Sequence, residues 1–261
     1  MQNEYYTREE FSDFMRGMQK ASEIARAVNP DIYMVSLNGG QPLFDVLTLA
    51  NRDVDTSLAV YFPISSKIMD SGKVAERCFT NLFLERQHQE SKVQRILSLD
   101  EVVSGGSVSK ILNAYDSSLR IVGKHNVGRH DRGAISKEVR HLAEQFPINI
   151  IGIREPRAGT KAKYREEVKK GRIEEIPVKR ILTMDDPDMH IAVFDHPKSN
   201  GWHGQGYFPT VGDIRITPKY QNFLKDVAMY FGVDPKDVSP QGLGRIREHA
   251  KKYSAKPDFG H

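Results

Sequence analysis

The chain has 261 residues, of which 39% are hydrophobic and 28% charged, a composition that excludes a disordered chain and allows a sizeable core. The formal net charge of +4 is too small to indicate a nucleic-acid partner by itself, and it suits an anionic small molecule. The first ten residues are polar and acidic, no apolar run reaches the roughly 20 residues that span a bilayer, and the lone Cys78 excludes an intramolecular disulfide framework. We therefore expect a cytoplasmic protein without a membrane segment.

The first half of the chain alternates short apolar runs with amphipathic segments. Such alternation predicts an α/β fold with a central parallel sheet flanked by helices, Rossmann-like in outline. Helices are predicted at 9–28, 43–51, 74–94 and 108–115, and strands at 32–37, 57–64, 95–103 and 119–123.

The second half is less regular. A helix at 136–146, strands at 148–153 and 191–194, a helix at 218–231 and a final basic helix after Ser239-Pro240 are predicted. We expect residues 1–195 to form the α/β core with insertions, and residues 196–261 to form a hood or a helical C-terminal extension.

The most informative segment runs from Ile96 to Val108: a hydrophobic strand, the carboxylates Asp100 and Glu101, a turn of small residues, and a helix. The turn is Ser104-Gly105-Gly106-Ser107. Carboxylates on a loop that directly follows a strand can bind ribose hydroxyls or the coordination shell of a Mg²⁺ ion. Glycines allow the backbone to approach a ligand, and amides at a helix start favour phosphate.

This segment resembles the signature of type I phosphoribosyltransferases, which bind phosphoribosyl pyrophosphate (PRPP). The family pattern is a hydrophobic strand, two acidic residues, two hydrophobic residues and a Thr/Ser-Gly-x-Thr/Ser phosphate loop. The present segment is one residue shorter. Aligning the loops places Asp100 at the second acidic position, whereas aligning the acids implies a deletion. An ordinary strand–turn–helix with solvated acids is the alternative interpretation.

Two further loops match the family in order and spacing. Asn38-Gly39-Gly40 follows the first strand, where family members wrap pyrophosphate with backbone amides; two glycines supply strained conformations at least cost. Lys67 follows the second strand, where some members carry a lysine that reaches pyrophosphate, and Lys73 can serve from the same mobile loop. The alternatives are a plain turn and solvated surface lysines.

The resemblance implies transfer of a 5-phosphoribosyl group from PRPP to a nitrogenous base or related acceptor, with release of pyrophosphate. It assigns Mg²⁺ as the cofactor, held by Asp100 and Glu101, and makes these two residues and Lys67 the catalytic set. Family members are often dimers, so a homodimer is compatible with it. Trp202 and His203, in a Gly-rich aromatic loop at 195–212, are candidates for binding the acceptor; a surface loop with Trp202 in the core is the alternative.

Three rival functions stay open. The first is a non-catalytic module with the same fold that senses PRPP or a nucleotide. The second is a metal-dependent hydrolase. The third is nucleic-acid binding through residues 154–180, which hold ten Lys or Arg and five Glu; the interleaved Glu residues favour a solvated helix face, so we do not expect a nucleic-acid partner. The hydrolase would use Asp185, Asp186, Asp188, His190, Asp195, His196 and His203.

Overall fold

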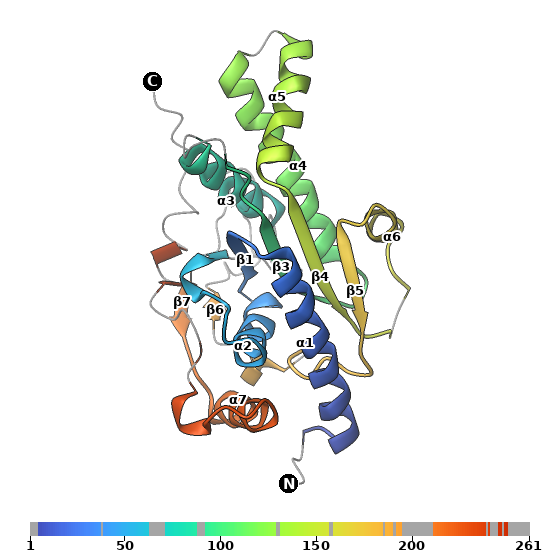
Figure 1. Ribbon diagram of the computed structural model, residues 1–261, viewed down its shortest axis with the longest axis vertical. Helices are drawn as coiled ribbons and strands as arrows, with labels where there is room; N and C mark the ends of the chain where they lie inside the picture. Colours follow the sequence, from blue (N-terminus) through green and yellow to red (C-terminus); the bar gives the residue numbers. More distant parts are fainter. Residues whose placement is uncertain are drawn as a thin grey trace, which may run out of the picture.

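The sheet predicted from the sequence is present, and it is fully parallel. In the computed structural model, five strands lie between two layers of helices (Figure 1). The predicted fold class, an α/β protein with a central parallel sheet, is therefore confirmed. The structure describes residues 5–37, 39–62, 71–87, 92–128, 131–156, 159–184, 186–189, 192–194 and 211–238, together with 240, 245–246 and 248–249.

The strand order is β2-β1-β3-β4-β5, with every neighbouring pair parallel. A separate antiparallel pair, β6 with β7, lies outside this sheet. The bounds of the strands are β1 Ile32–Ser36, β2 Ala59–Phe62, β3 Ile96–Val102, β4 Ile148–Arg154, β5 Ile173–Pro177, β6 Ala192–Phe194 and β7 Val211–Ile214.

Helices cover both faces of the sheet. Helices α1, α2 and α7 pack on one face, and α3, α4, α5 and α6 contribute to the core on the other. Their bounds are α1 Arg8–Val28, α2 Gly40–Ala50, α3 Ser71–Arg86, α4 Gly106–Val127, α5 Arg132–Gln145, α6 Ala162–Lys169 and α7 Pro218–Tyr230, with short 3₁₀ turns at Thr56–Leu58, Pro187–Met189 and Pro235–Asp237. No helix among these is both long and apolar enough to cross a membrane.

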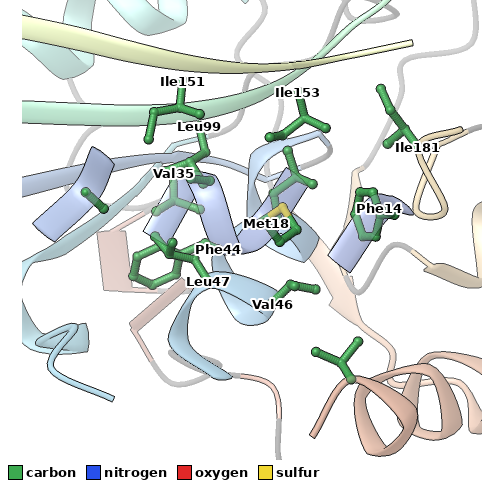
Figure 2. Packing of buried hydrophobic residues seen from close by; sticks show 14 of the residues in the cluster. Phe14, Met18, Val35, Phe44, Val46, Leu47, Leu99, Ile151, Ile153 and Ile181 are labelled. Atoms are coloured by element: carbon green, nitrogen blue, oxygen red, sulfur yellow. The ribbon is translucent and has the colours of Figure 1, made fainter. Parts of the chain in front are cut away.

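The strands are apolar on both sides because both faces are covered. On one face, Val35, Leu99 and Ile151 point toward Phe44 and Leu47 of α2 (Figure 2). The next residue along each strand points the other way, as the two-residue repeat of a strand requires. The sequence 32–37 therefore has no polar side, and this is why it was recognisable as a buried strand.

The opposite face holds an aromatic cluster. Phe79 and Phe83 of α3 pack with Tyr115 of α4, with ring centroids 5.7 Å apart for both pairs that involve Tyr115. Phe146 joins them at 4.9 Å from Phe83. Offset and edge-on ring contacts of this kind add to simple burial, and they fix α3 and α4 against β3.

The C-terminal helix α7 is tied to α2 by buried polar groups. The Tyr220 hydroxyl donates to Asp45 Oδ2 at 2.6 Å, and Gln41 Nε2 donates to the same oxygen. All three side chains are buried. A buried hydrogen-bonded network of this kind holds its members in one geometry, so α7 helps to fix the first turn of α2.

The prediction of a strand at 119–123 was wrong, because these residues lie inside α4. Tyr115, Leu119 and Val122 are buried at helical spacing on one side of this 22-residue helix. A short apolar run is compatible with either a strand or a buried helix segment, and periodicity alone does not separate them. The helix predicted at 108–115 is the first half of α4.

The fifth strand of the sheet was also misplaced. The prediction at 148–153 is confirmed as β4, but residues 192–194 pair with β7 rather than with the sheet. The fifth strand of the sheet is β5, with the sequence Ile-Glu-Glu-Ile-Pro, and it lies within the basic segment at 154–180. It lies at an edge with only Ile173 and Ile176 buried, so it has the polar sequence that edge strands tolerate.

The remaining predicted elements differ mainly at their ends. Helix α3 ends at Arg86 rather than Gln94, whose backbone amide instead bonds the carbonyl of Gln145. Helices α1, α5 and α7 are confirmed within a few residues of the predicted bounds. Residues 195–210 and most of the predicted final helix lie outside the described residues.

Candidate functional site

The strand order places a topological switch point between β1 and β3 at the carboxyl edge of the sheet, and this point is called the crevice. The chain leaves β1 toward β2 on one side and returns to β3 on the other, so the loops after β1 and β3 diverge. In open α/β sheets, ligands bind at such a switch point. The Gly39-Gly40 and Asp100–Ser107 motifs are the two loops that border it.

The turn after β3 delivers the start of α4 to this crevice. Gly105 is the N-cap residue, with a left-handed φ of 72°, and no side chain caps the helix. The first amides of an α-helix lack partners within the helix, and the aligned peptides give that end a partial positive charge. The predicted phosphate turn therefore has the geometry that favours an anion.

Gly105 and Gly106 serve different purposes. A Cβ on Gly105 would lie 2.4 Å from the ring of Tyr164, so α6 packs directly beneath the turn. A Cβ on Gly106 would meet only the ends of side chains, with Lys161 Nζ at 3.1 Å and Ser104 Oγ at 3.5 Å. Gly105 is required by the scaffold, whereas Gly106 keeps the backbone accessible.

The Gly39-Gly40 pair brings the start of α2 against β3. Gly39 has φ −91° and ψ −35°, and neither glycine has a positive φ, so the expectation of unusual backbone conformations was wrong for both. The structure shows a spatial reason instead. A Cβ on Gly39 would lie 2.6 Å from Asp100 Oδ1, and one on Gly40 would lie 2.6 Å from the carbonyl oxygen of Leu99.

Asp100 lies at the centre of the crevice. Asp100 belongs to β3 rather than to the loop after this strand, where the sequence predicted it, and the residue is only 3% exposed. The Ser36 hydroxyl donates to Oδ1 at 3.3 Å, and Ser36 Oγ accepts the Gly40 amide at 2.8 Å. Burial raises the pKa of Asp100 to about 6, although hydrogen bonds from Ser107, the Glu101 backbone and Ser36 oppose this rise.

The second oxygen of Asp100 is a buried acceptor whose hydrogen-bonding capacity is unused. Within the described residues, Oδ2 has no hydrogen-bond partner. A buried polar atom without a partner costs free energy, and such atoms are rare in folded proteins. This oxygen is therefore suited to receive a hydroxyl or a cation from a ligand.

Glu101 comes from the opposite face of β3 but converges on the same place. Its Oε1 accepts a hydrogen bond from Thr183 Oγ1 at 2.6 Å. Its Oε2 lies 3.6 Å from the position that a Cβ on Gly39 would occupy, beside Asp100. Two carboxylates suit Mg²⁺. In the described part of the chain, they are not part of a larger cluster, because no group of three or more His, Cys, Asp or Glu residues that could hold a metal ion is found there.

The lysines predicted for pyrophosphate are only partly placed. Lys73 is exposed in the first turn of α3, at the carboxyl end of β2 and thus at the same edge of the sheet. Asn38, Lys67, Trp202 and His203 lie outside the described residues, so their predicted roles stay predictions.

Two residues of the site were not predicted. Thr183 follows β5, and Lys161 lies in the connection from β4 to α6. Neither belongs to a short motif, and only the pairing of β4 and β5 with β3 brings them to this edge. The sequence around Thr183 and Lys161 carries no local signal that predicts either residue as part of the site.

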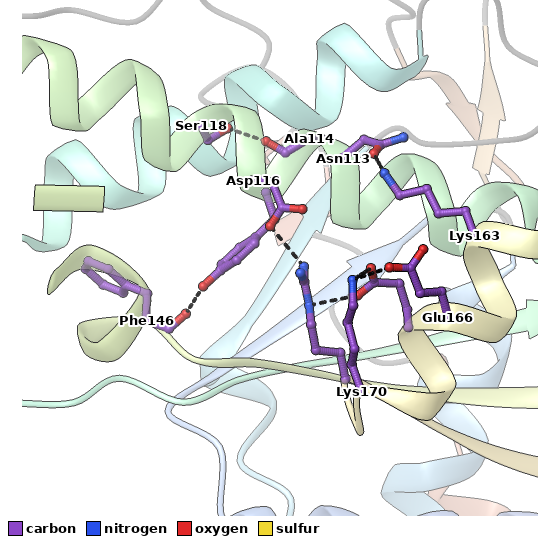
Figure 3. A network of polar contacts seen from close by, with 11 residues as sticks. Asn113, Ala114, Asp116, Ser118, Phe146, Lys163, Glu166 and Lys170 are labelled. Atoms are coloured by element: carbon purple, nitrogen blue, oxygen red, sulfur yellow. Dashed lines mark hydrogen bonds and ion pairs between the residues drawn. The ribbon is translucent and has the colours of Figure 1, made fainter. Parts of the chain in front are cut away.

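Many cations of the basic segment at 154–180 are paired with acids of the segment itself or of neighbouring helices. Arg172 pairs with Asp116 at 3.1 Å, and Lys170 pairs with Glu166 at 2.8 Å (Figure 3). Arg154 also pairs with Glu175, at 2.6 Å. The charged helix face predicted for this segment is present only in α6, which holds Glu166 and Glu167, whereas Glu174 and Glu175 lie in the strand β5. The ion pairs account for much of the positive charge of the segment.

The described members of the His/Asp cluster have local roles. Asp186 Oδ1 accepts the backbone amide of Asp188 at 3.0 Å, and Asp186 also pairs with Lys219. The first interaction stabilises the turn at Pro187–Met189, and the second ties this turn to α7. The remaining members, Asp185, His190, Asp195, His196 and His203, lie outside the described residues.

Substitution of the two turn glycines should change the stability by different amounts. Gly105→Ala should lower the free energy of unfolding by at least about 2 kcal/mol, because the residue needs a positive φ and lacks space beside Tyr164. Gly106→Ala should change it by less than about 1 kcal/mol. Urea unfolding measures both.

A control separates the two costs at Gly105. Gly171 also has a positive φ, 74°, but nothing lies within 4 Å of its Cβ position. Gly171→Ala should therefore show the conformational cost alone, about 1 kcal/mol. Equal losses for Gly105→Ala and Gly171→Ala would contradict the packing of Tyr164 against the turn.

Comparison with known proteins adds no assignment: no family model matches the chain, and no curated protein and no solved structure matches it significantly.

Proposed function

We propose that the protein binds PRPP and Mg²⁺ in the crevice between β1 and β3 and transfers the 5-phosphoribosyl group to a nitrogenous base or related acceptor, releasing pyrophosphate. One observation carries the proposal. Two helix starts with glycine N-caps, those of α2 and α4, meet at a buried carboxylate that has an unpartnered oxygen. The first turns favour phosphate groups, and the carboxylate favours hydroxyls or a metal ion.

Each part of PRPP has a matching group at this edge. The 5-phosphate fits the turn at the start of α4, where Gly106 leaves the backbone accessible. The ribose hydroxyls fit Asp100 Oδ2 and the carboxylate of Glu101. The pyrophosphate fits the start of α2 and the cation of Lys73, with Lys67 predicted beside it. This assignment keeps the two phosphate-bearing ends of the substrate on different helices.

The residues present fit Mg²⁺ because the unpartnered oxygen of Asp100 and the carboxylate of Glu101 are hard oxygen donors. Together with oxygens of the substrate, these two side chains would hold the ion. When bound, Mg²⁺ would neutralise charge on the departing pyrophosphate. The protein's own contribution is to orient the ribose and to place positive helix ends at the phosphates.

In the reaction, the bond between C1 of the ribose and pyrophosphate breaks while the acceptor nitrogen bonds to C1. Positive charge develops on the ribose, and the carboxylates of Asp100 and Glu101 stabilise it. The pyrophosphate leaves with the electron pair of the broken bond, toward the start of α2. Exclusion of water from the crevice protects PRPP from hydrolysis.

A second candidate is a PRPP- or nucleotide-sensing module with the same fold and no turnover. The burial of Asp100 favours it. This carboxylate is only 3% exposed and receives hydrogen bonds from the hydroxyls of Ser36 and Ser107, so a ligand reaches one of its oxygens at most. Binding of PRPP is common to both candidates, and release of pyrophosphate separates them.

The test is calorimetric titration of PRPP with Mg²⁺, followed by a screen of bases for pyrophosphate release. Gly106→Val should weaken PRPP binding at least about tenfold, because its side chain blocks approach to the α4 amides. Gly133→Val is the matched control, since Gly133 also occupies the first turn of a helix, α5, that does not border the crevice. Wild-type protein that binds no PRPP would refute the proposal, and binding without release for any base would favour the sensing module.

Asp100→Asn should bind PRPP less tightly yet be more stable at neutral pH. The folded state raises the pKa of Asp100 from 3.8 to about 6, so its contribution to stability is fully present below pH 3.8 and is lost as the pH rises through about 6. A shift of two units corresponds to about 3 kcal/mol. The stability gain of Asp100→Asn should therefore approach that size at pH 7 and vanish near pH 4.

Denaturant unfolding at several pH values, with PRPP titrations, measures both effects. Glu101→Gln tests the second carboxylate, and at least one of the two variants should lose more than about tenfold in affinity. An Asp100→Asn protein that is less stable and binds PRPP normally would show that the carboxylate serves only to hold Ser36 and Ser107.

A further inference from the structure

The connection after β4 is attached to the end of β3 and to the phosphate turn that follows it. The Glu155 amide donates to the carbonyl of Val102 at 3.2 Å, and the Lys161 amide donates to the carbonyl of Ser104 at 3.0 Å. Helix α6 begins at the next residue and contains the exposed Lys163 and the buried Tyr164. The backbone of Lys161 is therefore held beside the start of α4 by a main-chain hydrogen bond.

The Lys161 side chain lies over the first turn of α4. Its Nζ is 3.1 Å and its Cε 3.6 Å from the position that a Cβ on Gly106 would occupy. The ammonium thus stands beside the helix end that already carries partial positive charge. Two positive groups at one place repel each other unless an anion lies between them.

In the described part of the chain, several neighbouring cations have side-chain partners that Lys161 lacks. Lys163 bonds Asn113, Lys170 bonds Glu166 and Glu167, and Arg172 bonds Asp116. Within the described residues, no ion pair or hydrogen bond of the Lys161 ammonium is found. Among the described residues, the ammonium of Lys161 lies beside the phosphate turn with no acid paired to it.

An independent feature of the same turn also points to a ligand. The Ser107 hydroxyl, in the first turn of α4, bonds the carboxylate of Asp100. That residue is 97% buried, and its Oδ2 is unpartnered among the described residues. The turn thus presents a cation and helix amides beside a buried acceptor, which is the chemistry that recognises a phosphate and a hydroxyl on one molecule.

We infer that Lys161 is the specificity-determining cation for the terminal phosphate of a phosphorylated sugar. Its ammonium and the first amides of α4 hold the phosphate dianion, while Asp100 accepts from a hydroxyl of the same sugar. This inference rests on the proposed function and adds a residue from outside the three predicted loops. It also gives a role to part of the basic segment at 154–180.

The inference predicts a selective loss of affinity. Lys161→Ala should weaken binding of ribose 5-phosphate and of PRPP with Mg²⁺ at least about tenfold. Its affinity for inorganic pyrophosphate with Mg²⁺ should stay within about twofold, because pyrophosphate fits the start of α2. The loss should shrink as salt rises, since Lys161 is exposed.

Two variants sharpen the test. Lys161→Arg keeps the charge and should bind ribose 5-phosphate within about threefold of the wild type. Lys163→Ala removes an equally exposed lysine two residues along, whose ammonium bonds Asn113 on α4, and should leave all three affinities unchanged. Calorimetric titration measures them, with circular dichroism to verify the fold.

The possible results separate the two proposals. Normal binding of ribose 5-phosphate by Lys161→Ala would overturn the role of Lys161 and leave the proposed function standing. An equal loss of ribose 5-phosphate and pyrophosphate would overturn the selectivity. Wild-type protein that binds neither ribose 5-phosphate nor PRPP would overturn both the inference and the proposed function.

Discussion

The burial of Asp100 between the first turns of α2 and α4 is the constraint on which the rest of the site depends. Its carboxylate occupies the space that a side chain on Gly39 would need, and Ser36 links it to the Gly40 amide. Helix α2 can start this close to β3 because its N-cap is Gly39, and α4 can start against Tyr164 because its N-cap is Gly105. The ionised carboxylate is costly in this place, and a cost of this kind is characteristic of functional residues.

The supporting structure explains why the arrangement persists. Tyr164 packs under Gly105 from α6, and the Asp45–Tyr220 hydrogen bond fixes α2 from α7. The two helix starts are therefore held from opposite faces of the sheet (Figure 1). A site supported in this way keeps its phosphate-binding amides in position before a ligand arrives, which reduces the free energy that binding must spend on ordering.

Most of the fold and part of the site could be predicted from sequence, for identifiable physical reasons. β1, β3 and β4 carry apolar residues on both sides, because they are covered on both faces. β5 escaped prediction because an edge strand needs few apolar residues. Helix α4 was divided because the short, mostly apolar run Leu119–Gly123 is compatible with either a strand or a buried helix segment. The glycine turn was found because its chemistry is local. Lys161 and Thr183 were missed because only the pairing of distant strands brings them to the crevice.

The most direct test of this account is a crystal structure of the protein with PRPP and Mg²⁺. The account predicts the 5-phosphate within hydrogen-bonding distance, roughly 2.7–3.2 Å, of the amides of Gly106 and Ser107. A ribose hydroxyl or the metal ion should lie against Asp100 Oδ2, and pyrophosphate should lie near the start of α2. PRPP bound away from this crevice, or a turn at Ser104–Ser107 that stays empty at saturating PRPP, would contradict the central claim.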